Sequence, residues 1–505
     1  MKILFLYPKT IFQTWPLATD LSRFVYRYPA VTFPLFASTV SKENEVRIYD
    51  DVVDNSSMKE YKKILEWADI IAISLQSAKL LLNCQITLKL IRKINPDAKT
   101  IIGGQHPSLN FDFWKDRIGN EVDILVCGEA DFTFPRIVKA IKGMDNLEEI
   151  PGVSFRKNGE LITSPPPIPV DDLDKTPFPD WTKSRIDKYA LRFYPKRVLC
   201  GSVESSRGCK NACTFCGTSK MWDHKQRFKS AERVLEEIDI LVKMGIKELS
   251  YVDDNFGGDV ERDTEICKKI IERNYNIKWW CFMRADTVLK NPEFIEIAGK
   301  SGFSQVVMGF ESLAPSRLKK FKKGYDKELS IEQYLTVYQR LRKAGTFVIG
   351  QFIIGGINET EEELKTTLEN CHLVCDCPTV NYFEPVAGTE DSRKLIESHN
   401  LDMIEIHYSI REISSLIESH ISKDFYKFNI MNYLSPRSLG KFFSSDIVIR
   451  NYYRSIYRSV FKNLTALNPE RLRDYFIIHN KKLNTKEKIE KIRSLYLSDG
   501  FIESL

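Results

Sequence analysis

The sequence has no long hydrophobic run and no strong excess of one charge. None of its uninterrupted apolar stretches approaches the ~18 residues of a membrane span, and residues 1–8 lack the apolar core and the small-residue cleavage site of a signal peptide. The net formal charge is only +6 over 505 residues, which does not demand a nucleic-acid partner. We therefore expect a cytoplasmic protein with no nucleic-acid partner.

Cysteine is also scarce, with 11 residues in the whole chain. Eleven cysteines are too few for a disulfide scaffold of this length, and an odd number cannot all pair with one another. Reduced thiols in a cytosolic chain point instead to metal binding or catalysis, so their grouping matters more than their number. Cys371, Cys375 and Cys377 lie close together, but they run from a helical pattern into a strand, and we do not assign them to a site.

The length is enough for three or four domains, and the pattern of apolar runs divides the chain. Over residues 1–165, short strand-like runs alternate with amphipathic helical patterns and end in a hairpin around Asn158-Gly159. This alternation predicts an α/β domain with a doubly wound, flavodoxin-like parallel sheet. The expected parallel strands cover residues 3–8, 46–51, 70–74, 100–104 and 124–128.

A second alternating series follows a proline-rich linker at residues 166–195. Residues 196–395 contain six strand-like segments separated by helical patterns, which predicts a partial (β/α)6 barrel with functional groups at the carboxyl ends of its strands. The expected strands cover residues 198–205, 248–253, 279–284, 306–311, 347–354 and 380–384.

Residues 396–505 show only helical patterns, and we expect a helical, basic C-terminal domain. From residue 436 onward there are 14 Lys and Arg residues against 7 Asp and Glu residues, with aromatic residues between them. Two interpretations stay open: a face for an anionic ligand or a peripheral membrane contact, and an ordinary helical core with solvated basic side chains. The first predicts salt-sensitive binding that weakens when the residues after 436 are removed.

The strongest chemical signal directly follows the first strand of the second series. Cys209, Cys213 and Cys216 fall within eight residues, so their thiolates can converge on one metal centre. The uneven spacing favours a four-iron cluster with one iron left open to a ligand. A zinc site with His224 as the fourth ligand is the alternative, although zinc usually takes more regular Cys and His spacings.

This Cys-x3-Cys-x2-Cys loop, with Phe215 just before its third cysteine, resembles the radical S-adenosylmethionine (SAM) superfamily. The resemblance implies that the three cysteines hold a [4Fe–4S] cluster and that SAM binds its open iron. It further implies that an electron, delivered by an external donor of flavodoxin or ferredoxin type, breaks a C–S bond of SAM and yields a 5′-deoxyadenosyl radical. The protein then contributes binding and electrostatics.

The same resemblance assigns residues at later strand ends to SAM, with Phe215 beside them. Asp253, or backbone carbonyls of the same segment, is expected to receive the amino group, and Arg284 the carboxylate. Glu311, in a segment similar to Gly-x-Glu-Ser, is expected to accept from the ribose hydroxyls, and Gln351 to face the adenosine. Each could also be an ordinary salt-bridged or capping residue; we prefer the functional interpretation for Arg284 and Glu311.

The N-terminal sheet resembles the cobalamin-binding domain found in one branch of this superfamily. The matching segments are Gly103-Gly104-Gln105-His106 and Gly128-Glu129-Ala130-Asp131, at the ends of two expected strands. The resemblance implies cobalamin contacts at Pro8, Leu75, Gln76, Ser77, Gly103, Gly104, Gln105, His106, Gly128 and Glu129.

No histidine is expected on the lower face of the cobalt. None of the 7 histidines lies in the Asp-x-His-x-x-Gly frame of cobalamin domains that ligate cobalt through histidine. The loop at residues 75–77, or water, should cover that face instead. His106 should either orient a loop or touch the edge of the corrin, the alternative being an ordinary hydrogen-bonded surface histidine.

Together these features predict a cobalamin-dependent radical SAM methyltransferase that methylates an unactivated carbon through methylcobalamin and a 5′-deoxyadenosyl radical. The alternative in the same class is a cobalamin-binding enzyme that performs a rearrangement, ring contraction or cyclisation without methyl transfer. A more distant alternative is a non-enzymatic, zinc-stabilised binding protein. The sequence does not identify the substrate beyond a small or lipid-like molecule.

Overall fold

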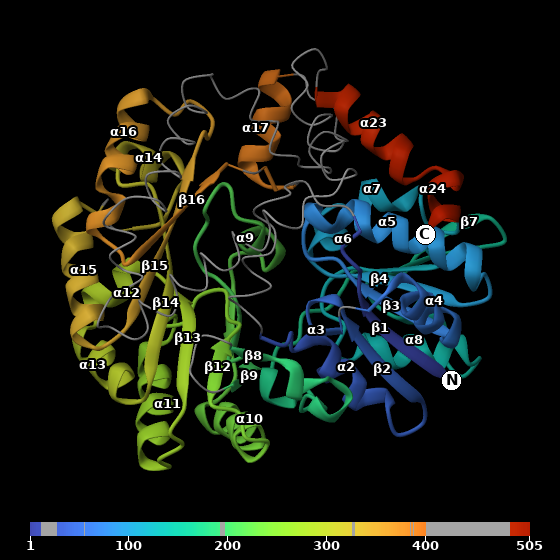
Figure 1. Cartoon of the computed structure of the whole chain (residues 1–505), viewed down its shortest axis with the longest axis horizontal. Coiled ribbons are helices and arrows are strands. Elements are labelled where there is room, and N and C mark those ends of the chain that lie inside the picture. The colour runs from blue at the N-terminus through green and yellow to red at the C-terminus, as the bar shows by residue number, and fades with distance from the viewer. Residues whose placement is uncertain are drawn as a thin grey trace.

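The structure is a computed structural model, and it describes residues 1–11, 28–54, 56–191, 197–325, 329–383, 385–386, 388–399 and 485–505. Two seven-stranded sheets account for most of its strands. Figure 1 shows the first sheet in blue to cyan and the second in green to orange, side by side. The chain is therefore a mixed α/β protein with two largely parallel sheets, as expected.

The first sheet has the strand order β2-β1-β3-β4-β5-β6-β7. Its strands β1 to β5 are parallel, and β6 and β7 form an antiparallel hairpin at one edge. The strands are β1 (Lys2–Tyr7), β2 (Glu45–Asp50), β3 (Ile70–Ser74), β4 (Lys99–Gly103), β5 (Ile124–Val126), β6 (Val153–Lys157) and β7 (Glu160–Thr163). β3 is buried along its whole length, because helices cover both faces of the sheet.

Different helices cover the two faces of the first sheet. On one face lie α2 (Thr32–Val40) and α8 (Thr133–Ile141), where the rings of Phe36 and Phe134 stack with centroids 5.4 Å apart. On the other lie α4 (Met58–Trp67) and α5 (Leu81–Ile94). The chain also forms the short helices α3 (Asp51–Asp54), α6 (Gln105–Leu109) and α7 (Phe111–Lys115).

The second sheet has the order β16-β15-β14-β13-β12-β9-β8. Six of its strands are parallel and lie in chain order, while the two-residue β8 pairs antiparallel with β9 at one edge. The strands are β8 (Ala190–Leu191), β9 (Val198–Val203), β12 (Glu248–Tyr251), β13 (Lys278–Met283), β14 (Phe303–Glu311), β15 (Phe347–Ile354) and β16 (Cys377–Tyr382). β8 lies inside the expected linker, so those residues add an edge strand to this sheet.

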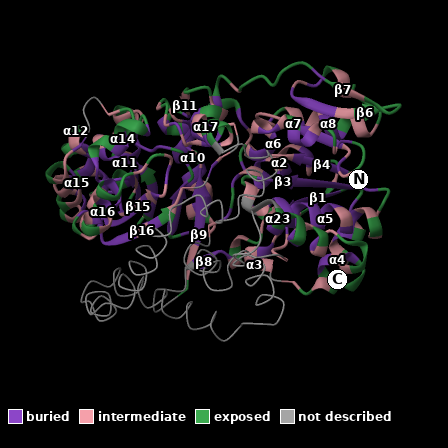
Figure 2. Cartoon of the chain, turned by 90° about the horizontal axis from the view of Figure 1, so that it is seen from above, coloured by how far each residue is buried: buried purple, intermediate pink, exposed green. Residues whose placement is uncertain are grey.

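The helices that follow these strands pack on one face of the sheet. Along β13, Trp279, Cys281 and Met283 belong to the core beneath these helices, whereas Trp280 and Phe282 alternate to the other face. Figure 2 shows the sheets buried between exposed helix surfaces. The helices are α10 (Ala231–Lys243), α11 (Val260–Glu272), α12 (Ala285–Lys290), α13 (Pro292–Lys300), α14 (Pro315–Lys320), α15 (Ile331–Lys343) and α16 (Glu361–Asn370).

The expected C-terminal domain is described only at its two ends. α17 (Glu390–His399) follows the second sheet, and most of the basic stretch from residue 436 lies outside the described residues. Figure 1 shows α23 (Thr485–Tyr496) and α24 (Asp499–Ser504), in red, next to α5 of the first sheet. Among the described residues, no helix combines the length and apolar character needed to cross a membrane.

The terminal helices complete the apolar core of the first sheet. Ile489, Ile492, Tyr496 and Ile502 are buried in the same cluster as the apolar face of α5. The Lys89 ammonium donates a hydrogen bond of 2.6 Å to a backbone carbonyl just after α23. A segment almost four hundred residues away in sequence thus covers α5.

We expect Ile492→Ala to lower the midpoint of thermal unfolding, because emptying a buried isoleucine site costs about 2–5 kcal/mol. The exposed neighbour Lys491 provides the control, since Lys491→Ala removes no buried contact. Calorimetry of both variants checks the prediction. Equal midpoints would contradict the packing of α23 on α5.

Candidate cofactor site

A cavity of about 390 Å³ lies where the carboxyl ends of strands from both sheets meet. From the first sheet it is lined by residues at the ends of β1, β3, β4 and β5. From the second it is lined by residues that follow β9 and β12. The predicted cobalamin contacts that line it are Gln76, Gly103, Gly104, Gln105, Gly128 and Glu129.

Pro8, Leu75, Ser77 and His106, also predicted as contacts, are not among the lining residues. Leu75 is fully buried in the core, and its backbone N–H and C=O bond to Gly103 and His106. Ser77 is exposed ahead of a short 3-10 turn, and Pro8 is buried directly after β1. These four residues therefore lie next to the strand ends but outside the lining of the cavity.

The His106 ring lies against aromatic rings and points away from the cavity. Its Nδ1 accepts a hydrogen bond of 3.1 Å from the Trp114 indole N–H, and both Phe113 and Trp114 meet it edge-on. The side chain is buried, so the structure favours the loop-orienting interpretation over a corrin contact. No histidine is among the described residues that line the cavity.

Two glycines at this cavity are required by the path of the chain. Gly104 has φ +108°, and a Cβ there would lie 2.7 Å from the Leu75 carbonyl oxygen. Gly128 has φ +79°, and a Cβ there would lie 2.6 Å from Pro167. At both positions the clash of an added Cβ is with protein atoms. The two glycines are therefore explained by close packing of the chain, and they do not by themselves indicate a ligand.

The three clustered cysteines lie on a loop closed by a short antiparallel hairpin. β10 (Ser206–Gly208) and β11 (Gln226–Phe228) pair at its base, and α9 (Gly217–Met221) begins directly after Cys216. All three thiols are free and partly accessible. Burial raises the pKa of the Cys213 thiol to about 11, and the nearby charges of Lys323 and Arg284 oppose that rise.

The loop is tied to its surroundings near its second and third cysteines. The Thr214 hydroxyl donates to Asp391 at 2.8 Å, and its N–H donates to the Phe321 carbonyl at 3.1 Å. The Phe215 ring meets Phe321 edge-on at 4.9 Å. Within the part of the chain that the structure describes, no three Cys, His, Asp or Glu side chains converge closely enough for a single metal ion.

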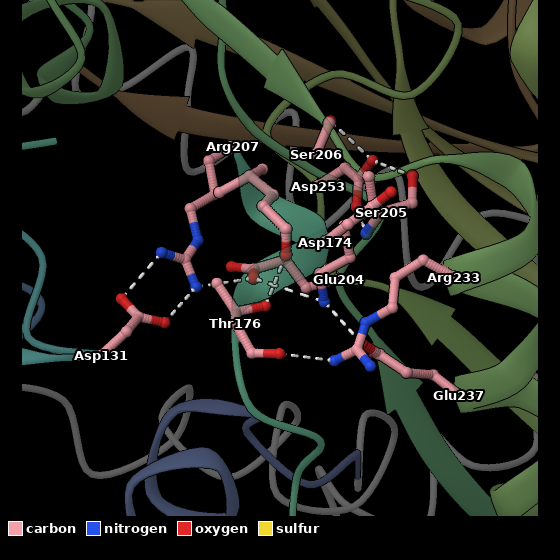
Figure 3. Close-up of polar contacts among 12 residues, drawn as sticks. Asp131, Asp174, Thr176, Glu204, Ser205, Ser206, Arg207, Arg233, Glu237 and Asp253 are labelled. Carbon is pink, nitrogen blue, oxygen red and sulfur yellow. Dashed lines mark hydrogen bonds and ion pairs between the residues drawn. The ribbon is translucent and has the colours of Figure 1, made fainter. Parts of the chain in front are cut away.

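Asp253 holds the segment that leads into this loop. Its carboxylate accepts from the Ser205 N–H at 2.7 Å and from the hydroxyls of Ser205 and Ser206 at 2.6 and 2.7 Å (Figure 3). Burial raises the pKa of this carboxyl, while the Ser205 hydrogen bonds and the Arg262 charge lower it. These contacts give Asp253 a structural task, and its binding to a SAM amino group stays a prediction.

Asp254, which the sequence did not single out, clamps both sides of the cysteine loop. Its carboxylate accepts from the Gly208 N–H at 3.1 Å, just before Cys209, and from the Thr218 hydroxyl at 3.0 Å, just after Cys216. It also lines the cavity. The loop and the cavity therefore share a wall.

Glu311 and Lys323 form a buried ion pair beside the cysteine loop. Glu311 Oε1 accepts from Lys323 Nζ at 2.7 Å, and both side chains are about nine-tenths buried. Burial lowers the pKa of the Lys323 ammonium, but Glu311, Tyr325 and Cys213 together raise it by more, so the net shift is upward. Glu311 also has φ +62°, a strained backbone for a residue with a side chain, and such strain concentrates at functional sites.

Arg284 lies next to this pair but is already engaged. Its guanidinium donates to Asp286 at 2.9 Å and to the Lys323 carbonyl at 2.8 Å. Gln351, half-buried on β15, is in register with Gly309 on β14, close in sequence to Glu311. The structure therefore brings Glu311, Arg284 and Lys323 together near Cys213. Of these three residues, Lys323 was not predicted from the sequence.

Comparison with known proteins agrees with this arrangement. Residues 203–371, which include the three cysteines, Asp253, Arg284, Glu311 and Gln351, match the family described as the radical SAM superfamily. The match covers about a third of the chain, so this part of the chain is similar to the radical SAM superfamily. The matched range runs from the end of β9 past β15.

Two curated relatives resemble this chain over different shares of its length. An uncharacterised methyltransferase of Pyrococcus horikoshii is 28% identical over 441 residues, covering 85% of this chain and 94% of that protein. The anaerobic magnesium-protoporphyrin IX monomethyl ester cyclase of Rubrivivax gelatinosus is 28% identical over 289 residues, covering 56% of this chain and 50% of that protein.

Two solved structures share the fold. The radical SAM methyltransferase TsrM from Kitasatospora setae, with cobalamin and a [4Fe–4S] cluster bound, has a TM-score of 0.61 at 15% identity, covering 79% of this chain and 75% of that chain. The cobalamin-dependent SAM radical enzyme OxsB, with aqua-cobalamin bound, has a TM-score of 0.63 at 18% identity, covering 100% and 80%. At this identity the likeness shows the fold alone.

We expect Gly208→Ala to reduce the iron and sulfide bound after anaerobic reconstitution. Gly208 has φ +92°, and a Cβ there would lie 2.1 Å from the Lys225 carbonyl oxygen, so the base of the loop must open. Gly245 is a matched control, because it has φ +84° with nothing within 4 Å. Gly245→Ala carries only the backbone strain of about 1–2 kcal/mol. Equal iron contents in the two variants would contradict the predicted clash.

We expect Lys323→Met to weaken SAM binding and lower the unfolding midpoint, because breaking a buried ion pair costs about 3–5 kcal/mol. Adding Glu311→Gln should restore the midpoint in part without restoring SAM affinity. Lys322→Met is the control, since Lys322 forms an exposed pair with Glu390 and such pairs contribute about 0–1 kcal/mol. Calorimetric SAM titration and thermal unfolding test both points; unaltered SAM affinity in Lys323→Met would exclude the pair from the SAM site.

Proposed function

We propose that this protein is a cobalamin-dependent radical SAM methyltransferase that methylates an unactivated carbon of a small-molecule substrate. The observation that carries the proposal is the position of the cysteine loop. The three free thiols lie on a loop whose flanking residues, Ser206 and Thr218, line the same cavity as the carboxyl ends of the first sheet. Chemistry at the loop and a group held by the first sheet can therefore meet.

The residues present fit the cofactors that this function needs. Three free thiols on one loop suit a [4Fe–4S] cluster with an open iron. Strand ends that meet at one cavity suit cobalamin. That its cobalt takes no histidine from this chain stays a prediction. When bound, the cluster supplies the electron that cleaves SAM, and cobalamin supplies a methyl group that a carbon radical can accept.

The chain's own residues bind and orient these groups. Cys209, Cys213 and Cys216 ligate three irons. Glu311, held by Lys323, receives the ribose hydroxyls of SAM, and Arg284 beside them adds positive charge for its carboxylate. Asp253 and Asp254 fix the loop, so that the open iron keeps a constant place relative to the cavity.

The same proposal assigns tasks to the parts of the chain. Residues 1–165 form the flavodoxin-like cobalamin domain, 166–195 the linker, 196–395 the partial (β/α)6 barrel, and 396–505 a helical domain that contributes to substrate choice. The electron comes from an external donor of flavodoxin or ferredoxin type in the cytoplasm. Within this class we favour methyl transfer over ring closure, because the match spans 94% of the methyltransferase relative and only 50% of the cyclase.

Anaerobic reconstitution with iron, sulfide and cobalamin, followed by incubation with SAM and a strong reductant, tests the proposal. We expect 5′-deoxyadenosine to form and Cys209→Ala to abolish it, because the cluster loses a ligand. Cys267→Ala is the control, since Cys267 is buried in α11. When the enzyme methylates a substrate, S-adenosylhomocysteine and 5′-deoxyadenosine should form in equal amounts. Formation of 5′-deoxyadenosine with a product of unchanged mass would favour the rearrangement instead.

A further inference from the structure

Arg207, which leads into the cysteine loop, is paired with a residue that follows a strand of the first sheet. Arg207 lies on β10, two residues before Cys209, and is 7% exposed. Its two terminal nitrogens each donate to one oxygen of Asp131, at 2.8 Å (Figure 3). Asp131 follows β5 of the first sheet. This bidentate pair is the strongest geometry that an arginine and a carboxylate can adopt, and it spans the two halves of the chain.

A second arginine faces Arg207 across the hairpin. In the β10–β11 register, Arg207 lies directly opposite Arg227. Like charges directly opposed in an antiparallel pair destabilise it. The penalty is greater here than at a surface, because the two side chains are only 8% and 17% exposed and water screens them poorly.

The carboxylate of Glu129 lies between these two arginines. Its Oε1 accepts from Arg207 at 2.5 Å, and its Oε2 accepts from Arg227 at 2.7 Å and from the Val170 N–H at 2.7 Å. Both oxygens are therefore engaged, and the side chain is 4% exposed. One carboxylate from the first sheet bridges two guanidinium groups on the second half of the chain.

The hairpin itself is short. It consists of three residue pairs, and isolated two-stranded hairpins are marginal in water. Further bonds hold its Ser206–Phe228 end: the Lys229 N–H donates to the Ser205 carbonyl at 2.9 Å, and Arg262 donates to the carbonyls of Ser205 and Lys229 at 2.7 and 3.1 Å. Gln226 Nε2 also donates to the Ser206 hydroxyl at 3.2 Å. Glu129 supplies its counter-charge at the central Arg207–Arg227 pair, nearer to Cys209.

Further ion pairs extend from Arg207 away from the first sheet, with basic and acidic side chains in alternation. Arg207 meets Glu204 at 2.9 Å, Lys229 meets Glu204 at 3.9 Å and Glu237 at 2.7 Å, and Glu237 meets Arg233 at 3.1 Å. Arg233 in turn donates to the Thr176 carbonyl of the linker at 2.9 Å. Figure 3 shows residues of this network from Asp131 to Thr176. Arg207 thus has two further carboxylate partners, Asp131 and Glu204, whereas Glu129 is the carboxylate that it shares with Arg227.

We propose that Glu129 is a positioning residue for the cluster. By neutralising Arg207 and Arg227 together, it keeps the base of the cysteine loop closed, so that retention of the cluster depends on docking of the first sheet. The inference rests on the proposed function, because it takes the three cysteines as the cluster ligands. Glu129 acts through the two arginines and binds no iron.

The test uses Glu129→Gln, which keeps the shape of the side chain and removes its charge. After anaerobic reconstitution of the full-length protein with iron and sulfide, we expect iron to pass to a ferrous chelator about tenfold faster or more than from the wild type. Tenfold corresponds to about 1.4 kcal/mol, and we expect at least that effect because the buried Arg227 guanidinium loses the carboxylate of Glu129. The backbone amides of residues 206–208 and 226–228 should exchange with deuterium faster in the cluster-free variant.

Restoring the charge balance gives the discriminating measurement. Glu129→Gln combined with Arg227→Gln removes the repulsion, and we expect iron release within about threefold of the wild-type rate, because the effects of two residues in contact are coupled. Asp145→Asn is the matched control: Asp145 forms a bidentate pair with Arg136 within the first half of the chain. It should release iron at the wild-type rate.

Two results would overturn the inference. One is iron release and amide exchange in Glu129→Gln that equal those of Asp145→Asn. The other is a double variant that loses iron as fast as Glu129→Gln, since repulsion would then not be the cause. If Glu129→Gln yields no folded protein, folding and cluster retention in the double variant decide the point. A wild type that binds no cluster would refute the proposed function, and amide exchange in the cluster-free proteins would still test the role of Glu129.

Discussion

Two arginines face each other at the base of the cysteine loop, and a carboxylate from the other half of the chain lies between them. Charges removed from water need partners at fixed positions, and here Glu129 and Asp131, which follow β5, supply such partners to Arg207 and Arg227. Glu204 is a further partner of Arg207. Because Glu129 and Asp131 belong to the first half of the chain, these ion pairs also tie the cysteine loop to the first sheet.

The shared cavity is a consequence of the same docking. Once the turn after β5 meets β10, the carboxyl ends of strands from both sheets point into one space, with the loop forming part of its wall. Asp254 holds that wall by bonding to backbone and side chain on the two sides of the cysteines. The wall between the cavity and the cysteine loop thus depends on a few carboxylates that are held by hydrogen bonds and ion pairs within the protein.

Apolar periodicity was sufficient to locate the expected parallel strands to within a few residues, because buried strands between helices are continuously apolar. It missed β8, which is only two residues long, and it placed the start of β14 at residue 306 where the strand begins at Phe303. The three cysteines were equally visible, since their spacing is local in sequence. Lys323 and Asp254 were not, because their partners come from other strands and loops.

The predicted role of Asp253 shows the same limit in a different way. A carboxylate at the end of β12 is readable in the sequence, but its hydrogen bonds to Ser205 and Ser206 depend on where β9 ends beside it. Likewise His106 is visible as part of a Gly-Gly-Gln-His segment, while Trp114, which occupies its ring nitrogen, belongs to the next helix. The sequence predicts which residue types stand at the strand ends. It does not predict the orientation of each side chain, because that depends on partners from other elements.

The placement of α23 and α24 on α5 has a consequence for biosynthesis. A ribosome releases residues 1–165 long before it makes residues 485–505, so the apolar side of α5 that these helices cover stays open to water during most of translation. The first sheet therefore reaches its final burial after the second half of the chain has been made.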